Sequence, residues 1–472
     1  MPGMDTRVLI AGAGPTGLAL ACDLARRGVE HLVVDRDPGT FAGSRGKGLQ
    51  PRTLEVFADL GVVDRVLEHG GPYPPMRAWR GREVVWERSM HEVAAPRHGV
   101  PYPNPLMLPQ WRTCRILRER LAELGGRVEA GVELTGFEQD GSGVTARLGD
   151  RRVRAEYLVG ADGGRSAVRR GLGVGFVGET DEDHRQLIAD VRISGLDRDH
   201  WHFWADGDSD RPVLGACPLA GTDSFQVVTT RLEHASVEGF QALLTEASGR
   251  DDLVVSDLSW SSSWRPNVRM VDRYRVGRVF LAGDAAHVHA PTGGQGLNTG
   301  VQDAYNLGWK LALGAEELLD SYEAERMPVA AEVLGISSAL FGRVLAGGED
   351  AMDRSDPALR QLGVNYRGSA LSVELRAEPG SVRAGDRAPD GWCGARRVHA
   401  VLAGPGFTVL TFGRARYDGA YAVTDAPAFD VRGDAVAVVR PDGHIGLFAD
   451  DAEEVGAYLD RWSRGIRVTA PR

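Results

Sequence analysis

Residues 8–20 read VLIAGAGPTGLAL, and this stretch decides the fold. The apolar run at residues 8–11 predicts a buried strand, and residues 12–17 place glycines in a Gly-x-Gly-x-x-Gly spacing just before a helical stretch. In this spacing Gly12 permits a tight turn, Gly14 lets the backbone approach a pyrophosphate, and Gly17 lets helix and strand pack closely. The N–H groups at the start of the helix favour phosphate charge. The stretch therefore predicts a dinucleotide site.

The residues that follow complete a strand–helix–strand unit. We expect a helix over residues 16–27, ended by Gly28, and a second strand over residues 31–35. Asp35 ends this strand, where a carboxylate can hold a ribose hydroxyl. A glycine-rich turn kept only for packing would not explain Asp35. The unit predicts a Rossmann-like parallel sheet, and it leaves open whether the dinucleotide is NAD or FAD.

Composition and charge exclude several other classes of protein. The 472 residues are 43% hydrophobic and 25% charged, which is ordinary for a globular protein. The formal net charge is -10 without a basic block, so we expect no nucleic-acid partner. The four cysteines form no CxxC pair, and we expect neither a disulfide framework nor a metal site. We see no signal-peptide pattern and no uninterrupted apolar run of membrane-spanning length, and we expect a cytoplasmic protein with no membrane partner.

The rest of the chain predicts a mixed α/β organisation with more than one sheet. Residues 76–109 are rich in Pro, Arg and Trp and leave the first sheet. Strand-like pieces over 185–275, interrupted by a helix near 236–246, predict a second, largely antiparallel sheet, and a strand at 279–282 returns to the first. Residues 350–389 are polar and irregular, which indicates a boundary before a small C-terminal α/β region.

Three later segments choose the cofactor. Residues 160–166 read GADGGRS, residues 274–287 read YRVGRVFLAGDAAH, and residues 291–300 read PTGGQGLNTG. With these segments the chain resembles, over essentially its whole length, the single-component (group A) flavoprotein monooxygenases, the para-hydroxybenzoate hydroxylase superfamily. It is similar above all to the bacterial aromatic polyketide hydroxylases and rifampicin monooxygenase. The resemblance implies FAD as the cofactor and NAD(P)H as co-substrate.

The resemblance also implies a domain organisation. A Rossmann-like FAD-binding domain is expected at 1–75, 105–180 and 275–345, interleaved with an antiparallel-sheet substrate domain at 76–104 and 181–274. A linker at 346–384 is expected to lead to a thioredoxin-like C-terminal domain at 385–472. Residues 383–389 and 440–444 carry this last resemblance. Cys393 has no CxxC partner, so we expect a structural rather than a redox role for the C-terminal domain.

Individual residues take roles from the same resemblance. Asp35, where the family usually has Glu, is expected to bind the adenosine ribose, and Asp284 the ribityl chain. The motif at Asp162 and Gly163 is linked to both FAD and NAD(P)H binding. The loop at 291–298 is expected against the isoalloxazine ring, and the helix that begins near its end directs N–H groups at the pyrimidine edge of the ring. The expected cofactor-binding residues are Gly12, Gly14, Pro15, Thr16, Gly17, Asp35, Arg36, Arg45, Gln110, Arg115, Asp162, Gly163, Gly283, Asp284, Pro291, Gly294, Gly296, Leu297 and Asn298.

The implied activity is monooxygenation through a flavin hydroperoxide, formed from O2 and FAD that NAD(P)H has reduced. The expected substrate is an aromatic, phenolic or polyketide-like small molecule, and the outcome is hydroxylation or Baeyer–Villiger insertion. One alternative is a flavin-dependent halogenase or dehydrogenase, although residues 264–266 do not match the WxWxIP segment of tryptophan-type halogenases. The other is a non-catalytic FAD-binding accessory protein in a biosynthetic pathway. No catalytic base is assigned, and a monomer or homodimer is expected.

Two further signals have more than one interpretation. His287 and His289 are two residues apart and would share a face of a strand, but no carboxylate or cysteine cluster accompanies them, so we assign His287 to the flavin motif and predict no metal. The aromatic run at residues 201–204 fits a substrate pocket and core packing equally well.

Overall fold

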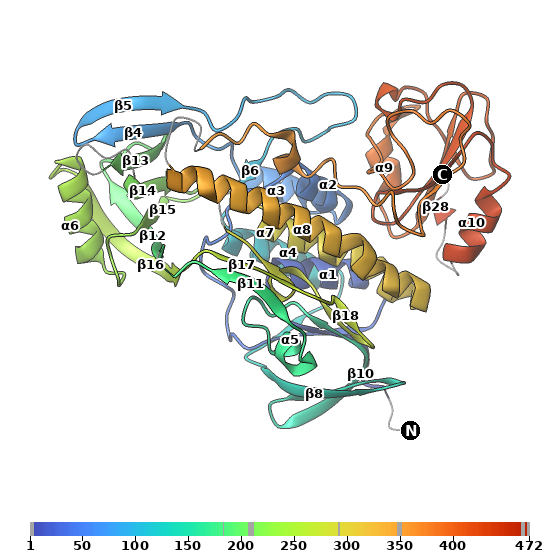
Figure 1. The fold of residues 1–472 in the computed structure, drawn as a ribbon, viewed down its shortest axis with the longest axis horizontal. Helices are drawn as coiled ribbons and strands as arrows, with labels where there is room; N and C mark the ends of the chain where they lie inside the picture. Colours follow the sequence, from blue (N-terminus) through green and yellow to red (C-terminus); the bar gives the residue numbers. More distant parts are fainter. Residues whose placement is uncertain are drawn as a thin grey trace.

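A computed structural model describes residues 4–182, 184–205, 212–290, 293–346, 352–463 and 468–469. Within these residues two large sheets and a C-terminal sheet are joined by long helices (Figure 1). The C-terminal sheet lies at one side of the molecule, and the sheet that contains β4, β5 and β13 lies at the other side. This arrangement confirms the predicted mixed α/β fold.

The first sheet has the glycine motif at its centre. Its strand order is β18 (Arg275–Val276), β19 (Val279–Leu281), β10 (Arg151–Gly160), β1 (Thr6–Ala11), β2 (His31–Asp35) and β7 (Val128–Ala130). The hairpin of β8 (Leu134–Asp140) and β9 (Gly143–Leu148) extends it along β10. The five strands from β19 to β7 run parallel. Because ligands of open parallel sheets bind beyond the carboxyl ends of the strands, this edge is where a dinucleotide is expected.

Three helices pack together beside the first sheet. α1 (Pro15–Arg26) lies against both α4 (Gln110–Glu123) and α7 (Gly296–Leu313). α1 begins one residue before the predicted start, because the fixed φ of Pro15 suits the first helical position. α4 begins directly after Pro109, which is its N-cap. Three shorter helices lie in the N-terminal part of the chain: α2 (Pro51–Asp59), α3 (Val63–His69) and α5 (Ala167–Leu172).

The second sheet is nearly all antiparallel. Its order is β16 (Val254–Trp264), β12 (Gln186–Ser194), β15 (Ser224–Thr229), β14 (Pro212–Pro218), β13 (Trp201–Ala205), β4 (Met76–Arg80) and β5 (Glu83–Arg88), with only β13 and β4 parallel. α6 (Val237–Ser248) covers one face and closes an apolar core with Trp204, Phe225 and Phe240. Side chains alternate between the two faces of a strand, so every second residue points away from α6.

Shorter elements connect the two large sheets. β11 (Phe176–Thr180), β17 (Asn267–Val271) and β20 (His287–Val288) form a three-stranded sheet. β3 (Gly48–Leu49) and β6 (Leu106–Met107) form a two-stranded ribbon. The 3-10 turn η1 (Gly283–Ala285) follows β19, and the 31-residue helix α8 (Glu316–Ala346) runs across the molecule (Figure 1).

The C-terminal region has its own sheet and two apolar clusters. The order is β21 (Val373–Glu374), β27 (Ile445–Ala449), β26 (Ala435–Val439), β24 (Phe407–Phe412) and β25 (Tyr421–Ala422), with β28 (Val468–Thr469) beside β24. The other elements are η2 (Pro357–Arg360), β22 (Trp392–Cys393), β23 (Arg396–Arg397), α9 (Val398–Leu402), η3 (Pro427–Phe429) and α10 (Val455–Trp462). One of the two clusters contains Trp309 of α7, so the C-terminal region packs directly on this helix. The predicted domain boundaries themselves stay a prediction.

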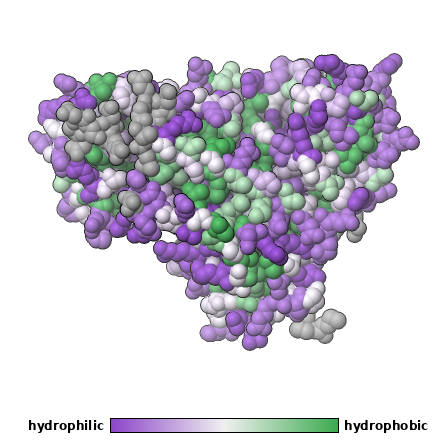
Figure 2. All heavy atoms as spheres, viewed as in Figure 1, coloured by the Kyte–Doolittle hydropathy of each residue, from purple (hydrophilic) through white to green (hydrophobic). Residues whose placement is uncertain are grey.

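One helix raises the question of a membrane. The stretch Glu316–Val344 of α8 is long and apolar enough to cross a membrane by length and composition, although a single such helix is weak support for one. Its charged residues Glu325 and Arg326 are buried in ion pairs with neighbouring elements. The face of the molecule seen in Figure 2 is hydrophilic at its periphery, and apolar residues gather toward its middle.

Candidate flavin site

The glycine motif has the geometry that the spacing predicts. Gly12 adopts a φ of +107°, and a Cβ there would lie 2.3 Å from the carbonyl oxygen of Ala161. A Cβ at Gly17 would lie 2.0 Å from the carbonyl oxygen of Gly12. Gly14, in contrast, has nothing within 4 Å of its Cβ position, and it caps α1 without any side-chain hydrogen bond to the helix N-terminus. The loop is therefore closed where it packs and open where a pyrophosphate would lie.

Asp35 and Thr16 tie the glycine loop to its surroundings. The Oδ2 atom of Asp35 accepts a hydrogen bond of 2.6 Å from the backbone N–H of Ala13. Its Oδ1 atom accepts a hydrogen bond of 2.9 Å from the backbone N–H of Asp37. Each carboxylate oxygen retains acceptor capacity for a further donor. A Cβ on Gly283 or Gly300 would lie 2.6 or 2.4 Å from the Oγ1 atom of Thr16. The start of α1, the turn η1 and the N-terminal part of α7 thus meet at Thr16.

The turn η1 presents Asp284 to solvent. Gly283 has a φ of +59°, and its N–H donates to the Oδ2 atom of Asp303 at 2.9 Å. The same oxygen bonds the Nε2 atom of buried His287 at 2.7 Å. Burial raises the pKa of the Asp303 carboxyl, but Arg326 and His287 lower it to about 2, so the carboxylate stays ionised. Asp284 itself is exposed and does not cap η1, and among the described residues its side chain has no hydrogen-bond or ion-pair partner, so the carboxylate is available to a ligand.

The loop before α7 is held by Asn298. Its Nδ2 atom donates to the carbonyl oxygens of Gly48 at 2.9 Å and Gly294 at 2.6 Å, and its Oδ1 atom accepts from the N–H of Gln50 at 2.8 Å. The Asn298 amide is fully used within the protein, so this residue positions the loop, and only its backbone is left for a cofactor. Gly294 adopts a φ of +60°, and Gln295 caps α7 without a side-chain bond. The first N–H groups of α7 remain free to act on a ligand.

A third segment joins the same region from residues 43–50. The Oε1 atom of Gln110 accepts a hydrogen bond of 3.0 Å from the N–H of Gly46. A Cβ on Gly46 would lie 3.2 Å from both Gln110 and Leu297, so this contact is close. Arg45 donates to the Oγ atom of Ser262 at 3.0 Å, and Arg115 is exposed beside the Trp111 ring. Gln110, Gly46 and Leu297 therefore meet, whereas Arg45 and Arg115 are exposed at the rim.

The Asp162 motif reaches η1 through an arginine that the sequence did not single out. The Oδ2 atom of Asp162 accepts from the N–H groups of Ala167 and Val168 at the start of α5, and its Oδ1 atom is buried without a hydrogen-bond partner among the described residues. Arg169 donates to the carbonyl oxygens of Ala285 at 2.9 Å and Gly164 at 2.7 Å. Of the other predicted residues, Gly163 has a φ of +80°, Arg36 is exposed beyond β2, and Pro291 lies outside the described residues.

A row of side chains across the second sheet was not recognised in the sequence. Asp190 pairs with Trp260 of β16 on one side and with Gln226 of β15 on the other, and Gln226 pairs with Cys217 of β14. Paired residues share a face of the sheet, and this face is opposite to the one that α6 covers. The row, Trp260, Asp190, Gln226 and Cys217, is visible only once the strand register is known.

Residues 41–47 lie across this row and form a buried polar network with it. Ser44 donates its hydroxyl to Asp190, and the amide nitrogen of Gln226 donates to Ser44 at 2.6 and 2.7 Å. The Nζ atom of Lys47 donates to the Oε1 atom of Gln226 at 2.6 Å and lies 4.2 Å from the centre of the Trp201 ring. Burial raises the pKa of the Asp190 carboxyl from 3.8 to about 6, and its bonds with Ser44 limit the rise.

The aromatic run at 201–204 divides between the two faces of the second sheet, so the predicted core packing is confirmed for part of it and the predicted pocket role stays a prediction. His202 and Trp204 are buried and stack with Trp79 in the core under α6. Trp201 and Phe203 alternate with them, and their ring centroids lie 5.1 Å apart on the opposite face. Trp201 therefore continues the row beyond Cys217 and lies beside Lys47.

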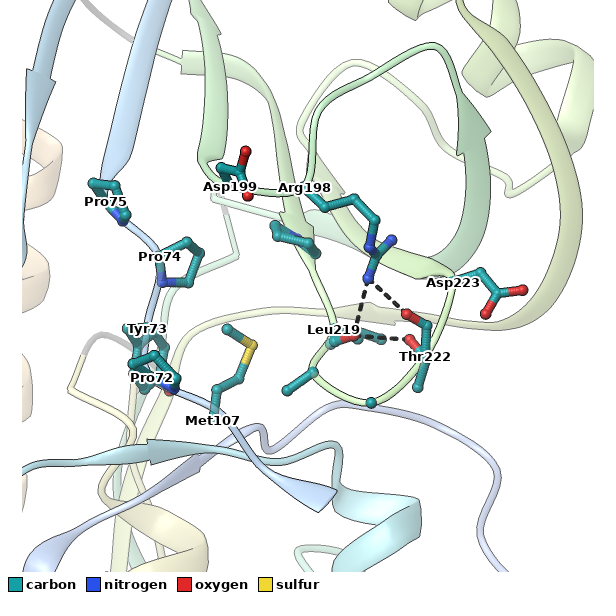
Figure 3. Close-up of a pocket in the computed structure, with 13 residues that line it drawn as sticks. Pro72, Tyr73, Pro74, Pro75, Met107, Arg198, Asp199, Leu219, Thr222 and Asp223 are labelled. Atoms are coloured by element: carbon teal, nitrogen blue, oxygen red, sulfur yellow. Dashed lines mark hydrogen bonds between the residues drawn. The ribbon is translucent and has the colours of Figure 1, made fainter. Parts of the chain in front are cut away.

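An open cavity of about 620 Å³ adjoins this end of the row. Its lining comes from the segment before β4, from Met107 of β6 and from the β14–β15 loop (Figure 3). Arg198 fixes that loop by donating to the carbonyl oxygens of Leu219 at 3.1 Å and Thr222 at 2.8 Å. Met107 pairs with Gly48, whose carbonyl oxygen is bonded to Asn298, so the β3–β6 ribbon links the lining of the cavity to the residue that holds the loop before α7. A volume of this size suits a small-molecule ligand.

Comparison with known proteins identifies the class. Residues 5–337 match the model of the FAD binding domain family, and the chain belongs to this family. It is 48% identical to a flavin-dependent monooxygenase of Mycobacteroides abscessus, with 96% of this chain and 99% of that protein covered. It is 34% identical to rifampicin monooxygenase of Streptomyces venezuelae, with 96% and 98% covered. Among solved structures, a complex of aklavinone-11 hydroxylase with FAD and aklavinone is similar at 28% identity and a TM-score of 0.82, with 98% and 99% covered.

The chain is therefore an FAD-dependent monooxygenase, and the predicted family, fold and cofactor are confirmed. The relatives support this activity over a halogenase or a dehydrogenase. The residues present fit FAD, because the loop has free space over Gly14, two helix N-termini lack side-chain caps, and Asp284 has an available carboxylate. When bound, FAD supplies the oxygen-activating chemistry.

Proposed function

We propose that this monooxygenase uses NAD(P)H and O2 to hydroxylate an electron-rich aromatic small molecule of phenolic or polyketide type. The observation that carries the proposal is the meeting of the glycine loop, η1 and the N-terminal part of α7 at Thr16, together with the segment at residues 43–50, which contacts Leu297 of α7 and the row of the second sheet. The relatives named above, which act on rifampicin and aklavinone, support a polycyclic substrate. Baeyer–Villiger insertion is the second outcome to be tested.

We propose that FAD is held in three parts. The pyrophosphate lies over Gly14 at the start of α1, where N–H groups and the helix dipole favour its charge. Asp35 accepts from the adenosine ribose, and Asp284 accepts from the ribityl chain. The flavin ring lies against Gly294 and the first N–H groups of α7, which stabilise negative charge on the pyrimidine edge. Asp162 and Gly163 contribute indirectly: Asp162 holds the start of α5, from which Arg169 donates to the carbonyl oxygen of Ala285 in η1.

We propose that the substrate enters the cavity near Tyr73 and reaches the flavin region along the Trp201 end of the row. Trp201 offers a flat aromatic surface, and Lys47 beside it offers a cation that would favour a phenolate. Gln226 accepts from Lys47 and donates to Ser44, which donates to Asp190, and this chain of hydrogen bonds fixes the position of the cation. The protein thus binds and orients the substrate and excludes water from it.

Oxidation of NADPH and of NADH by the FAD-loaded enzyme tests this function. Rifampicin, aklavinone and a simple phenol serve as probes, and isotopically labelled O2 identifies any oxygen inserted into product. We expect at least one aromatic probe to accelerate nicotinamide oxidation and to acquire one labelled oxygen. If neither NADPH nor NADH reduces the flavin in the presence of any of the probes, the result would instead favour a non-catalytic accessory protein. Product with an expanded ring or new ester would assign Baeyer–Villiger chemistry.

A further inference from the structure

Gln361 stands out in the linker between the FAD-binding elements and the C-terminal sheet. It follows η2, it is 3% exposed, and its φ is +57°. Residues other than glycine adopt this left-handed conformation with a loss of conformational free energy, and asparagine is among the residues for which this loss is smallest. A buried glutamine in this conformation is held by the groups around its side chain.

Within the described residues, the side-chain hydrogen bonds of Gln361 go to α7 and its N-cap. Its Nε2 atom donates to the Oε1 atom of Gln295 at 2.7 Å and to the Oγ1 atom of Thr299 at 3.1 Å. Its Oε1 atom accepts from the Nε2 atom of Gln302 at 2.5 Å. Gln295 is the N-cap of α7, and Thr299 and Gln302 lie in the first two turns of the helix. The Gln361 amide therefore has its donors and its acceptor in use.

The bonds continue from Gln295 into the loop before α7. The Nε2 atom of Gln295 donates to the carbonyl oxygens of Gly293 at 2.7 Å and Leu359 at 3.0 Å. A flip of the Gln295 amide would break these two bonds and also the bond from Gln361 to the Gln295 Oε1 atom, so Gln361 helps to fix the orientation of this amide. Gln302 returns to the same turn by donating to the carbonyl oxygen of Asn298 at 3.3 Å.

The linker reaches η1 by a second route. The guanidinium of Arg326 donates to the hydroxyl of Tyr366 at 3.0 Å and to the Oδ1 atom of Asp303 at 2.7 Å. Asp303 in turn accepts from the N–H of Gly283 at 2.9 Å. Residues 359–366 thus contact the start of α7 directly and η1 through Arg326 and Asp303, and these are the two elements that face the flavin in the proposed function.

We propose that Gln361 is a positioning residue for the flavin ring, and that the linker sets the loop at 293–296 and the N-terminus of α7 in their productive orientation. The inference rests on the proposed placement of the ring against this loop. Gln361 does not contact the cofactor; it acts through Gln295 and Thr299. Small displacements of the loop would change both the affinity for FAD and the share of reducing equivalents that reach the substrate.

Gln361→Gly is the principal test, because glycine accepts the left-handed conformation while all three side-chain bonds are lost. We expect the dissociation constant of FAD to rise about tenfold. We also expect a shift of the visible absorption of bound FAD and a rise of about twofold or more in hydrogen peroxide released per NAD(P)H oxidised. Gln361→Asn, which keeps the backbone conformation but is too short for the three partners, should change the same readouts in the same direction.

Asp430→Gly provides the matched control. Asp430 also has a left-handed φ, +49°, and also loses a side-chain bond on substitution, since its Oδ2 atom accepts from the N–H of Ser381. It belongs to the C-terminal sheet region, and we expect its FAD affinity, spectrum and peroxide yield to equal those of the wild type. Equal FAD readouts in Gln361→Gly, Gln361→Asn and Asp430→Gly would overturn the proposal.

Asp284→Ala separates this inference from the proposed function. If Asp284→Ala lowers FAD affinity and the two Gln361 variants do not, the placement of FAD stands and the role of Gln361 is refuted. If Asp284→Ala leaves FAD affinity unchanged, the placement itself is wrong, and the inference falls with it. If Gln361→Gly does not fold, Gln361→Asn decides alone, because asparagine adopts the same backbone conformation.

Discussion

At the scale of single residues, Asp284 is the most direct test of the cofactor placement. Its carboxylate is exposed just beyond a buried strand, it does not cap η1, and it has no hydrogen-bond or ion-pair partner in the part of the chain that the structure describes. A charge-assisted hydrogen bond is worth roughly 1.5–3 kcal/mol, so Asp284→Ala should weaken FAD binding by about one to two powers of ten. A titration of FAD into the stripped variant measures this change.

The melting point of the stripped Asp284→Ala variant distinguishes cofactor binding from a structural role. We expect it to stay close to that of the stripped wild type, because the side chain makes no cap bond. Asp460→Ala, at an exposed aspartate of α10, is the control for loss of a surface charge. Unchanged FAD affinity with a lowered melting point would assign Asp284 to the fold.

Asp190 predicts how the free energy of unfolding depends on pH. Burial raises the pKa of its carboxyl from 3.8 to about 6, so the protonated form is favoured by folding. The stability that this gives is complete below the unfolded pKa and is lost as the pH rises through about 6. Asp190→Asn has no such dependence, and wild type should lose about 3 kcal/mol relative to it between pH ~4 and pH ~8. Urea denaturation at several pH values measures the difference, with the exposed Asp257→Asn as the control.

At the scale of elements, the strand–loop–helix of the glycine motif separates packing from binding. Gly17→Ala places a Cβ 2.0 Å from a backbone oxygen, and the overpacking should lower the stability of the stripped protein by about 1–3 kcal/mol. Gly14→Ala meets nothing within 4 Å, so it should leave that stability nearly unchanged and weaken FAD binding instead. Paired denaturation and FAD titrations of the two variants check this. Equal stability losses, with FAD binding intact in Gly14→Ala, would contradict it.

The elements also show what the sequence can predict. The glycine spacing and Asp35 are local, and each glycine has the backbone contact or opening that the spacing predicts. The network of Ser44, Asp190 and Gln226 was not predicted, because its members are 146 and 182 residues apart from Ser44 and meet only through strand register. Gln361 carried no signal either, because a glutamine in the left-handed conformation has no sequence signature.

At the scale of the whole molecule, a buried ion network joins the C-terminal sheet to the first domain. Glu325 of α8 accepts from Arg440 at 2.8 and 2.9 Å and from Lys310 of α7 at 2.7 Å. Asp442 is bonded to Arg440 and, through its Oδ2 atom, to Asn306 of α7 at 3.1 Å. Burial lowers the pKa of Lys310, and Glu325 limits the decrease, to about 8. The C-terminal region therefore contributes Arg440 and Asp442 to a buried network that also contains Glu325 of α8 and Lys310 of α7, and Arg440 compensates part of the negative charge there.

This dependence predicts a large effect of a single substitution at the interface. Arg440→Met leaves Asp442 without its cation and Glu325 with Lys310 alone, and removing one partner of a buried pair costs about 3–5 kcal/mol. Urea denaturation should show that loss as a lower midpoint of one transition shared by both domains. Arg414→Met, which removes a 91% exposed arginine paired with Asp434 in the same C-terminal region, should cost less than about 1 kcal/mol. If Arg440→Met split the transition in two while leaving the first domain as stable as before, the C-terminal region would be an independent appendage and the charges of α7 and α8 would be balanced without it.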